Sequence, residues 1–147
     1  MARLTVEKRY RLQTRETERC VVILAGCGGT GSFLALHLAR LAYHLHETRG
    51  LRLPLVFVDP DAVEPKNLGR QNFAPAEVGR NKAQALAWRY NLAFGLDIAA
   101  QPERFDPAAV YAGARYGVDY GHWALLIGAV DNVAGRRSLV SDFGFGT

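Results

Sequence analysis

The chain has 147 residues, of which 49% are hydrophobic and 22% charged, and its formal net charge is +4 at pH 7. This size and composition are typical of one soluble globular domain with a substantial core. The 18 Lys and Arg residues against 14 Asp and Glu form no long block of one sign and no basic helix interleaved with aromatics, so we expect no nucleic-acid partner. No apolar stretch is long enough for a bilayer span or a signal peptide, so we expect no membrane association and a cytoplasmic location.

Residues 1–19 mix many arginines with glutamates and show no decisive periodicity. The segment is compatible with an edge strand through Leu4 and Val6, with a short helix, or with an arm that packs on another subunit. We interpret it as a charged N-terminal flank or arm that precedes the main domain at residues 20–147.

An apolar, β-branched run at residues 21–24 stops at a glycine-rich loop. Such a run is typical of a central strand of a parallel sheet, buried on both faces. Gly26, Gly28 and Gly31 match the pattern G-x-G-x-x-G, with Gly29 as an additional glycine. In this pattern the backbone approaches a phosphate closely, and N–H groups of the following helix face it. The motif predicts a nucleotide-binding loop, although a glycine-rich strand-to-helix turn without a ligand has the same pattern.

The two cysteines of the chain, Cys20 and Cys27, flank this strand. A disulfide between them would require the strand to fold back on itself, so we expect two reduced thiols. Because Cys27 lies inside the glycine-rich loop, we predict that it places the backbone there and is not a nucleophile.

Apolar residues recur at helical spacing after the loop and predict a helix over residues 30–43 that packs on the sheet. Three histidines, His37, His44 and His46, lie on this helix or just beyond it. Two neighbouring histidines without a third ligand make a poor metal site, so we interpret all three as structural or solvated.

A second strand is predicted at residues 55–58, and Asp59 and Asp61 follow it directly. An acid at the carboxyl end of a parallel strand, beside a glycine-rich loop, is well placed to accept hydrogen bonds from ribose hydroxyls. The separation between loop and acid exceeds the usual spacing of about 20 residues. We attribute the difference to an insertion at residues 44–52.

A polar segment at residues 62–73 is too long for a simple turn and is predicted to be a functional loop. A second helix is predicted over residues 79–92. Lys82 lies in the first turns of this helix, where a cation opposes the helix dipole, so we expect an anion close to it.

The rest of the chain predicts, in order, a short strand at 96–100, a loop or short helical region at 102–117, a strand at 123–130 that ends in Asp131 and Asn132, and a helix at 133–142. The order β-α-β-α-β-β-α predicts an α/β, Rossmann-like fold with a mostly parallel sheet and helices on both faces. Because no strand follows the last helix, we expect the fold to be incomplete at its C-terminal side. The chain would then be the N-terminal part of a longer protein or an unusually small protein of its class.

Five blocks of sequence resemble the adenylating domain of the ThiF, MoeB and ubiquitin-activating-enzyme superfamily. The blocks are Gly26-Cys-Gly-Gly-Thr-Gly31, Asp59-Pro-Asp-Ala-Val-Glu64, Asn67-Leu-Gly-Arg-Gln71, Gly79-Arg-Asn-Lys82, and Val130-Asp-Asn132 followed by Arg136. They occur in the family's order over residues 20–140, which is far more specific than a single glycine-rich loop. The resemblance implies that residues 20–147 form an ATP-binding adenylation domain.

The activity that the resemblance implies is ATP-dependent adenylation of the C-terminal glycine carboxylate of a small ubiquitin-fold or sulfur-carrier-like protein, with release of pyrophosphate. It also implies a homodimer. Members of the family commonly bring an N-terminal arginine to the nucleotide, often from the other subunit, and Arg11 and Arg15 are the candidates here. The chain has neither the later cysteine nor the Cys-x-x-Cys zinc ligands of many members, so the step after adenylation stays open.

The resemblance also implies roles for individual side chains. Arg70 and Lys82 would neutralise phosphates, Asp59 would bind the ribose, and Asp131 would hold Mg²⁺ as a hard oxygen ligand. The further nucleotide-binding residues are Gly26, Gly28, Gly29, Gly31, Asp61, Asn67, Gln71 and Asn132, whereas Glu64 and Arg136 are interpreted as structural.

Structural alternatives exist for four of these side chains. Asp59 and Asn67 could cap backbone groups, Arg70 could pair with Glu64, and Lys82 could pair with Glu77. Two other functions also stay open, namely an oxidoreductase that uses NAD or FAD and a non-catalytic module for nucleotide binding or partner docking. Lys82 and the loop at residues 67–71 argue against the oxidoreductase, because a dehydrogenase needs no clamp for a triphosphate.

Overall fold

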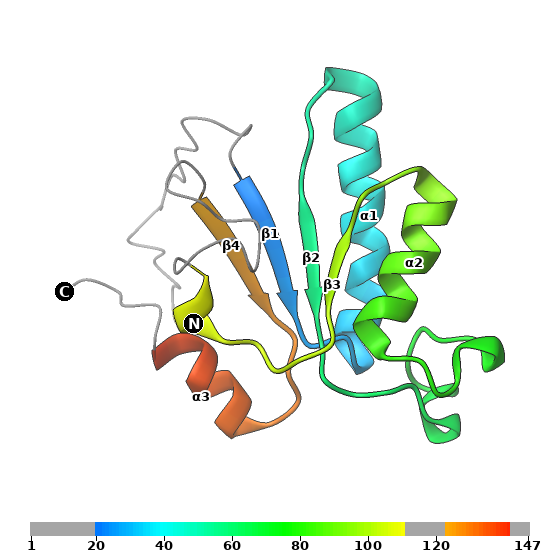
Figure 1. Ribbon diagram of the computed structural model, residues 1–147, viewed down its shortest axis with the longest axis vertical. Helices are drawn as coiled ribbons and strands as arrows, with labels where there is room; N and C mark the ends of the chain where they lie inside the picture. Colours follow the sequence, from blue (N-terminus) through cyan, green and yellow to red (C-terminus); the bar gives the residue numbers. More distant parts are fainter. Residues whose placement is uncertain (1–19, 111–122, 142–147) are drawn as a thin grey trace, which may run out of the picture.

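The computed structural model describes residues 20–110 and 123–141. This part of the chain contains a four-stranded parallel sheet in the order β3-β2-β1-β4 (Figure 1). The strands are β1 (Cys20–Ala25), β2 (Leu55–Val58), β3 (Ala99–Gln101) and β4 (Trp123–Gly128), and the α-helices are α1 (Gly29–Arg49), α2 (Lys82–Phe94) and α3 (Val133–Ser141). The predicted α/β, Rossmann-like class and the order of the elements are confirmed.

Helices cover both faces of the sheet (Figure 1), and successive side chains of each strand point alternately to these two faces. Val22 and Leu24 of β1 belong to the larger core cluster, which includes buried residues of α1 and α2. Val21 and Ile23 point to the other face and pack in a smaller cluster with Val110. On that same face α3 approaches β4, where Leu139 lies against Gly128. A strand with every residue buried, as in β1, is what its β-branched sequence predicts.

α1 is longer than predicted, because it begins at Gly29 and ends at Arg49. Residues 44–49 continue this helix, so the predicted end at residue 43 is wrong, and most of the segment interpreted as an insertion is an extension of α1. Gly50 ends the helix in the left-handed conformation, with φ of 64°; its N–H donates to the carbonyl of His46 at 2.9 Å, and the N–H of Leu51 donates to the carbonyl of Leu45 at 3.2 Å. His37, His44 and His46 all lie on α1 and are exposed.

α2 begins three residues later than predicted, at Lys82. Gly79 has φ of 89°, which is outside helical geometry, and Asn81 caps the helix by accepting the N–H of Gln84 at 3.1 Å. β3 also begins late, at Ala99, because the Asn91 side chain bonds both the N–H of Ile98 at 2.7 Å and its carbonyl at 3.0 Å. These side chains form hydrogen bonds with backbone N–H and C=O groups that would otherwise pair within the predicted helix and strand.

Strand β2 has the predicted bounds, whereas β4 ends at Gly128, before the predicted end at residue 130. Both cysteines are buried free thiols. In the part of the chain that the structure describes, no helix has the length and apolar character that a membrane span requires. The predicted flank at 1–19, residues 111–117 of the predicted loop and the end of the predicted last helix at 142 lie outside the described residues.

Candidate functional site

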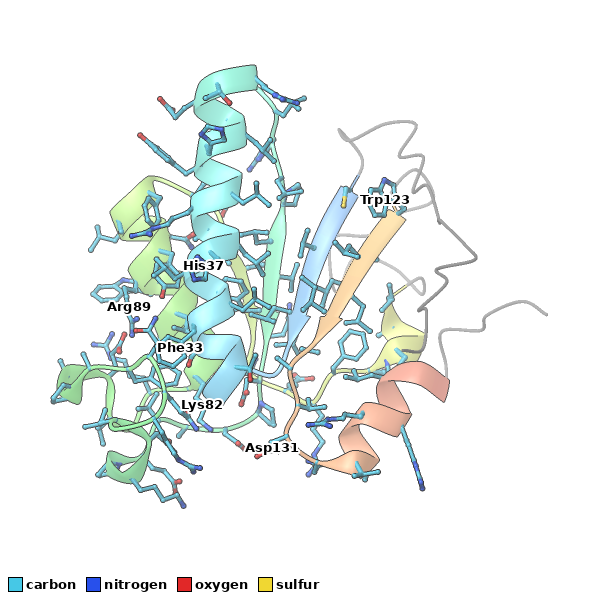
Figure 2. All side chains as sticks on the ribbon, turned by 180° about the vertical axis from the view of Figure 1, so that it is seen from behind. Phe33, His37, Lys82, Arg89, Trp123 and Asp131 are labelled. Carbon is cyan, nitrogen blue, oxygen red and sulfur yellow. The ribbon has the colours of Figure 1, made fainter. Side chains whose placement is uncertain are left out.

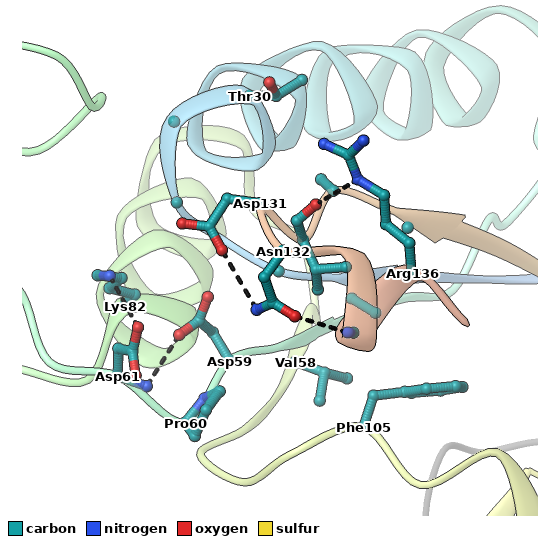
Figure 3. Close-up of a pocket in the computed structure, with 18 of the residues that line it drawn as sticks. Thr30, Val58, Asp59, Pro60, Asp61, Lys82, Phe105, Asp131, Asn132 and Arg136 are labelled. Atoms are coloured by element: carbon teal, nitrogen blue, oxygen red, sulfur yellow. Dashed lines mark hydrogen bonds and ion pairs between the residues drawn. The ribbon is translucent and has the colours of Figure 1, made fainter. Parts of the chain in front are cut away.

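A cavity of about 810 Å³ lies at the carboxyl edge of the sheet. The glycine-rich loop, the segment after β2, the start of α2 and the connection from β4 to α3 surround it (Figure 3). This volume is within the range of small-molecule sites. The residues of the predicted site that line the cavity are Gly26, Gly28, Gly29, Asp59, Asp61, Arg70, Gln71, Lys82, Asp131 and Asn132.

Two residues predicted for nucleotide binding do not line the cavity. A Cβ atom on Gly31 would lie 1.9 Å from the carbonyl oxygen of Gly26, so Gly31 permits close packing of α1 on the loop. Asn67 is only 2% exposed, and its Oδ1 accepts the N–H of Glu64 at 2.8 Å. The capping alternative for Asn67 is therefore present in the structure.

Gly26 brings the glycine-rich loop into contact with the next strand of the sheet. Its φ is 96°, and a Cβ atom there would lie 2.8 Å from the backbone carbon and oxygen of Ala129. Its N–H donates to the carbonyl of Val58 at 2.8 Å, and the N–H of Ala129 donates to Ala25 at 2.8 Å. Only glycine satisfies both the conformation and the space at position 26.

Asp59 ties the end of β2 to the glycine-rich loop. One carboxylate oxygen accepts the N–H of Cys27 at 2.6 Å and the other accepts the N–H of Asp61 at 2.8 Å. Burial raises the pKa of the Asp59 carboxyl above its ordinary value, although these two hydrogen bonds and the charge of Lys82 act in the opposite direction. Asp59 thus caps backbone groups, which was the structural alternative, and its role toward a ribose stays a prediction.

Lys82 extends from the first residue of α2 into the wall of the cavity. Its Nζ lies 3.2 Å from Oδ2 of Asp61, and the side chains are 8% and 68% exposed, respectively. Asp61 is therefore the anion that the position of Lys82 led us to expect (Figure 3). The alternative pairing with Glu77 is wrong, because Glu77 pairs with Arg89.

Asn81 is a residue of the site region that sequence reasoning missed. Its Nδ2 donates to the carbonyls of Asp59 at 2.7 Å and Asp61 at 3.1 Å, while its Oδ1 caps α2. One side chain thus holds the start of α2, and Lys82 with it, against the end of β2. An asparagine directly before a helical pattern is a helix-start signal that would have identified it.

Arg70 and Gln71 also line the cavity. Arg70 is exposed, and the predicted alternative partner Glu64 instead pairs with Lys66 at 2.7 Å. The Oε1 atom of Gln71 is buried and has no hydrogen-bond partner among the described residues. A buried acceptor beside a cavity that lacks a partner is available to accept a hydrogen bond from a ligand or from a bound water.

The connection from β4 to α3 forms the opposite wall. Asn132 caps α3 by accepting the N–H of Gly135 at 2.6 Å, and its Nδ2 lies 3.5 Å from Oδ1 of Asp131. Nε of Arg136 donates to the carbonyl of Val130 at 3.2 Å, which agrees with the structural role predicted for it. Asp131 itself is exposed to the cavity.

The cavity also has an apolar part that sequence reasoning did not identify. Val58, Phe105, Val130 and Leu139 contribute to it, and Arg104 lies beside Phe105. Phe105 follows β3, and the carboxyl ends of parallel strands meet at one edge of a sheet. That rule would have drawn attention to the residues after β3, which we had interpreted only as a connecting region.

Burial raises the pKa of the Cys27 thiol far above its ordinary value, and the negative charge of Asp59 acts in the same direction. Cys27 is completely buried. A thiol in this environment stays protonated, so it lacks the thiolate that a nucleophile requires.

Comparison with known proteins extends these observations. The ThiF family model matches residues 6–143, whereas a search of curated proteins finds no match. A solved structure of E. coli TcdA, a tRNA N6-threonylcarbamoyladenosine dehydratase, in complex with AMP superposes with a TM-score of 0.62 and 23% identity, covering 85% of this chain and 46% of that chain. PaaA superposes with a TM-score of 0.53 and 25% identity, covering 75% of this chain and 31% of that one.

The chain therefore spans less than half the length of these solved relatives. The same E. coli TcdA has also been solved in complex with ATP, with a TM-score of 0.61 to this chain. Because the family model covers nearly the whole sequence, from residue 6 to residue 143, the chain belongs to the ThiF family.

Proposed function

We propose that the chain is the ATP-binding part of an enzyme that adenylates a substrate carboxylate and releases pyrophosphate. The observation that carries the proposal is the position of Lys82. This buried cation lies at the N-terminal end of α2 and lines the same cavity as Arg70 and the glycine-rich loop. A buried ammonium group of this kind favours an anionic ligand.

The phosphates of the nucleotide would lie between the glycine-rich loop and Lys82. The first turn of α1 contains no acidic residue, and its N-cap Gly28 provides no side-chain cap. The N–H groups and the positive end of the helix dipole are therefore available to phosphate oxygens. The base would occupy the apolar part of the cavity near Phe105 and Leu139, with the ribose between these two ends, close to Asp59.

In the proposed reaction a carboxylate oxygen of the substrate bonds to the α-phosphorus. The bond from that phosphorus to the oxygen bridging to the β-phosphate breaks, and pyrophosphate leaves with the negative charge. Arg70 and Lys82 neutralise this charge as it develops. Lys82 exchanges Asp61 for a phosphate oxygen, and the exposed Asp61 carboxylate is then solvated by water at little cost.

A magnesium ion fits this site as an ion carried with the phosphates. No cluster of three or more His, Cys, Asp or Glu side chains suited to a metal occurs among residues 20–110 and 123–141. Mg²⁺ is commonly held by one or two carboxylates together with substrate phosphates, and Asp131 and Asp61 offer such carboxylates at the cavity. When bound, the ion would supply further neutralisation of phosphate charge, with Asp131 as its proposed ligand.

The proposed substrate is the C-terminal glycine of a small ubiquitin-fold protein, and the support for it is the resemblance of the five sequence blocks. The same resemblance supports a homodimer in which Arg11 or Arg15 of one copy reaches the nucleotide of the other. Both arginines lie outside the described residues. The TcdA relative is named for a tRNA nucleoside, so tRNA is the second substrate to test.

ATP–pyrophosphate exchange with a candidate ubiquitin-fold protein tests the proposal. We expect exchange that depends on the candidate protein and that falls roughly 100-fold or more in Arg70→Ala and in Asp131→Ala. Arg49→Ala and Asp97→Ala, which remove exposed charges outside the cavity, serve as matched controls and should retain full exchange.

Other results would contradict the proposed site or favour a different function. Robust exchange that survives both cavity substitutions would contradict the site. ATP binding without exchange would favour a non-catalytic nucleotide-binding module, and exchange that requires tRNA would replace the proposed protein substrate. Protection from thermal unfolding by NADH but not by Mg-ATP would favour an oxidoreductase.

A further inference from the structure

A second polar cluster lies behind the cavity wall and does not line the cavity. This cluster, which we call the Arg89 cluster, consists of Ser32, Asn72, Glu77, Arg89 and Tyr90. It joins α1, α2 and the segment between β2 and α2 that carries Arg70 and Gln71. No part of the function proposed above uses it.

Arg89 binds two separate points of that segment. Its Nε donates to Oε1 of Glu77 at 3.0 Å, and its Nη2 also pairs with the Glu77 carboxylate. Its Nη1 and Nη2 each lie 3.0 Å from the carbonyl oxygen of Asn72. Glu77 is buried and also accepts the N–H of Ala74 at 2.7 Å, so the contact with Arg89 fixes the segment on both sides of residue 74.

Asn72 also connects this segment to the first turn of α1. Its N–H donates to Oγ of Ser32 at 2.9 Å, and its Nδ2 donates to Oη of Tyr90 at 3.0 Å and to the carbonyl of Ser32 at 3.3 Å. Ser32 is completely buried, and its hydroxyl donates to the carbonyl of Gly29 at 3.2 Å. The residue that follows Gln71 is therefore tied to the glycine-rich loop.

Arg89 and Lys82 belong to the same helix and are seven residues apart, which is about two turns and brings them to one face. Figure 2 shows Arg89 farther along α2 than Lys82, on the side away from Asp131. α2 therefore carries Lys82 at the cavity and, two turns later, the side chain that holds Arg70 and Gln71 from behind.

We propose that Arg89 is a positioning residue that sets the place of Arg70 and Gln71 relative to Lys82, and thereby preorganises the phosphate end of the cavity. The inference rests on the proposed function, because it assumes that the ligand's phosphates lie at this end. A guanidinium group has five donors in a rigid fork and can bridge a carboxylate and a carbonyl at once, whereas a lysine ammonium is a point charge. An arginine is therefore specifically required at position 89.

The test compares Arg89→Ala, Arg89→Lys and the control Arg80→Ala. Arg80 is an exposed arginine whose guanidinium lies 5.1 Å from the centre of the Trp88 ring, outside the Arg89 cluster and the cavity. Two quantities are measured on the 147-residue chain: the exchange rate of the Asn72 amide proton, by NMR, and the affinities for Mg-ATP and AMP, by calorimetry.

We expect Arg89→Ala to speed exchange of the Asn72 amide and to weaken Mg-ATP binding by roughly tenfold, because misplaced charged groups lose much of their effect. AMP lacks the two outer phosphates, so its affinity should change much less. Arg89→Lys should be intermediate, since it keeps the charge but bridges only one partner. Arg80→Ala should match the wild type in both measurements.

Equal losses for Mg-ATP and AMP would indicate a general structural role and would overturn the proposal, as would unchanged amide exchange or unchanged Mg-ATP affinity in Arg89→Ala. If the wild type binds no nucleotide, the proposed function fails, and amide exchange still decides whether Arg89 fixes the segment. If Arg89→Ala does not fold, Arg89→Lys and Tyr90→Phe, which removes the phenolic partner of Asn72, provide the same comparison.

Discussion

Two walls of the cavity are built in different ways. The first, which we call the β2–α2 wall, contains Asp59, Asp61, Arg70, Gln71 and Lys82. Apart from the contact between Asp59 and Asp61, its polar contacts include pairs far apart in sequence: Lys82 with Asp61, 21 positions apart, and Asp59 with Cys27, 32 positions apart. The second, the β4–α3 wall, contains Asp131, Asn132 and Arg136. The hydrogen bonds of Asn132 with Asp131 and Gly135, and of Arg136 with Val130, join residues at most six positions apart.

The polar groups of the β2–α2 wall meet mainly when the chain folds, whereas those of the β4–α3 wall are ordered locally at the start of one helix. On the β2–α2 wall, Lys82 has its partner only if β2 and α2 are docked. On the β4–α3 wall, Asn132 forms its cap as soon as α3 forms. We infer that the β2–α2 wall is preorganised for charge neutralisation, while the β4–α3 wall is held mainly by the pairing of β4 with β1.

The largest expected effect comes from the glycine-rich loop, which lies between the two walls. Gly31→Ala would place a Cβ atom 1.9 Å from the carbonyl oxygen of Gly26 and 3.2 Å from Cβ of Ala129. The backbone must shift, so we expect a loss of roughly 3 kcal/mol or more in the free energy of unfolding. Gly29→Ala is the matched control, because no atom outside its own helix turn and chain neighbours lies within 4 Å of the added Cβ. Urea denaturation of both variants measures the difference, and equal stabilities would contradict this packing role.

The next largest effect concerns the cation of the β2–α2 wall. We expect Lys82→Ala to lower kcat/KM of ATP–pyrophosphate exchange on the order of 100-fold, because a buried charge-neutralising group is lost from the cavity. Lys66→Ala is the control, since Lys66 is exposed and pairs with the exposed Glu64. If both variants lose the same activity, net charge rather than the position of Lys82 controls the reaction.

A pair of cap substitutions compares the walls directly. Asn132→Ala removes a local helix cap, which typically costs about 1 kcal/mol. Asn81→Ala removes a cap and also leaves the carbonyls of Asp59 and Asp61 without the Asn81 donor, so we expect about 2 kcal/mol. Thermal and urea unfolding measure both losses. An equal or larger cost at Asn132 would contradict the contrast between the two walls.

The smallest effect is a pH dependence that arises at Asp59. Burial raises the pKa of this carboxyl above its ordinary value of 3.8, so the folded state binds the proton more tightly than the unfolded state. The stability that Asp59 contributes is therefore full below that value and is lost as pH rises through the folded-state pKa. The free energy of unfolding of the wild type, minus that of Asp59→Asn, should fall over this interval. Asp131→Asn is the control for removing one negative charge from the cavity, and a difference that rises with pH would contradict the assigned direction.

Much of the fold followed from local pattern. The β-branched run before Gly26 and the acid after residue 58 correctly located two of the strand ends that form the edge of the cavity, whereas β4 ends at Gly128, two residues before the predicted end. Helix and strand limits were less accurate where one polar side chain takes over backbone groups, as Asn81 does at α2 and Asn91 does before β3. These contacts span only three and seven residues, but at such short range several backbone conformations compete, and the residue pattern alone did not decide which one forms.

For this chain, the sequence by itself determined the α/β order of elements, the glycine-rich loop and the set of charged residues at the carboxyl edge, because these depend on residue type and spacing along the chain. The tertiary structure decided which partner each charged group takes. It placed Asp61 rather than Glu77 against Lys82 and put Arg89 behind Arg70 and Gln71. These choices depend on distances between segments far apart in sequence, which only the packing of α1 and α2 on the sheet defines.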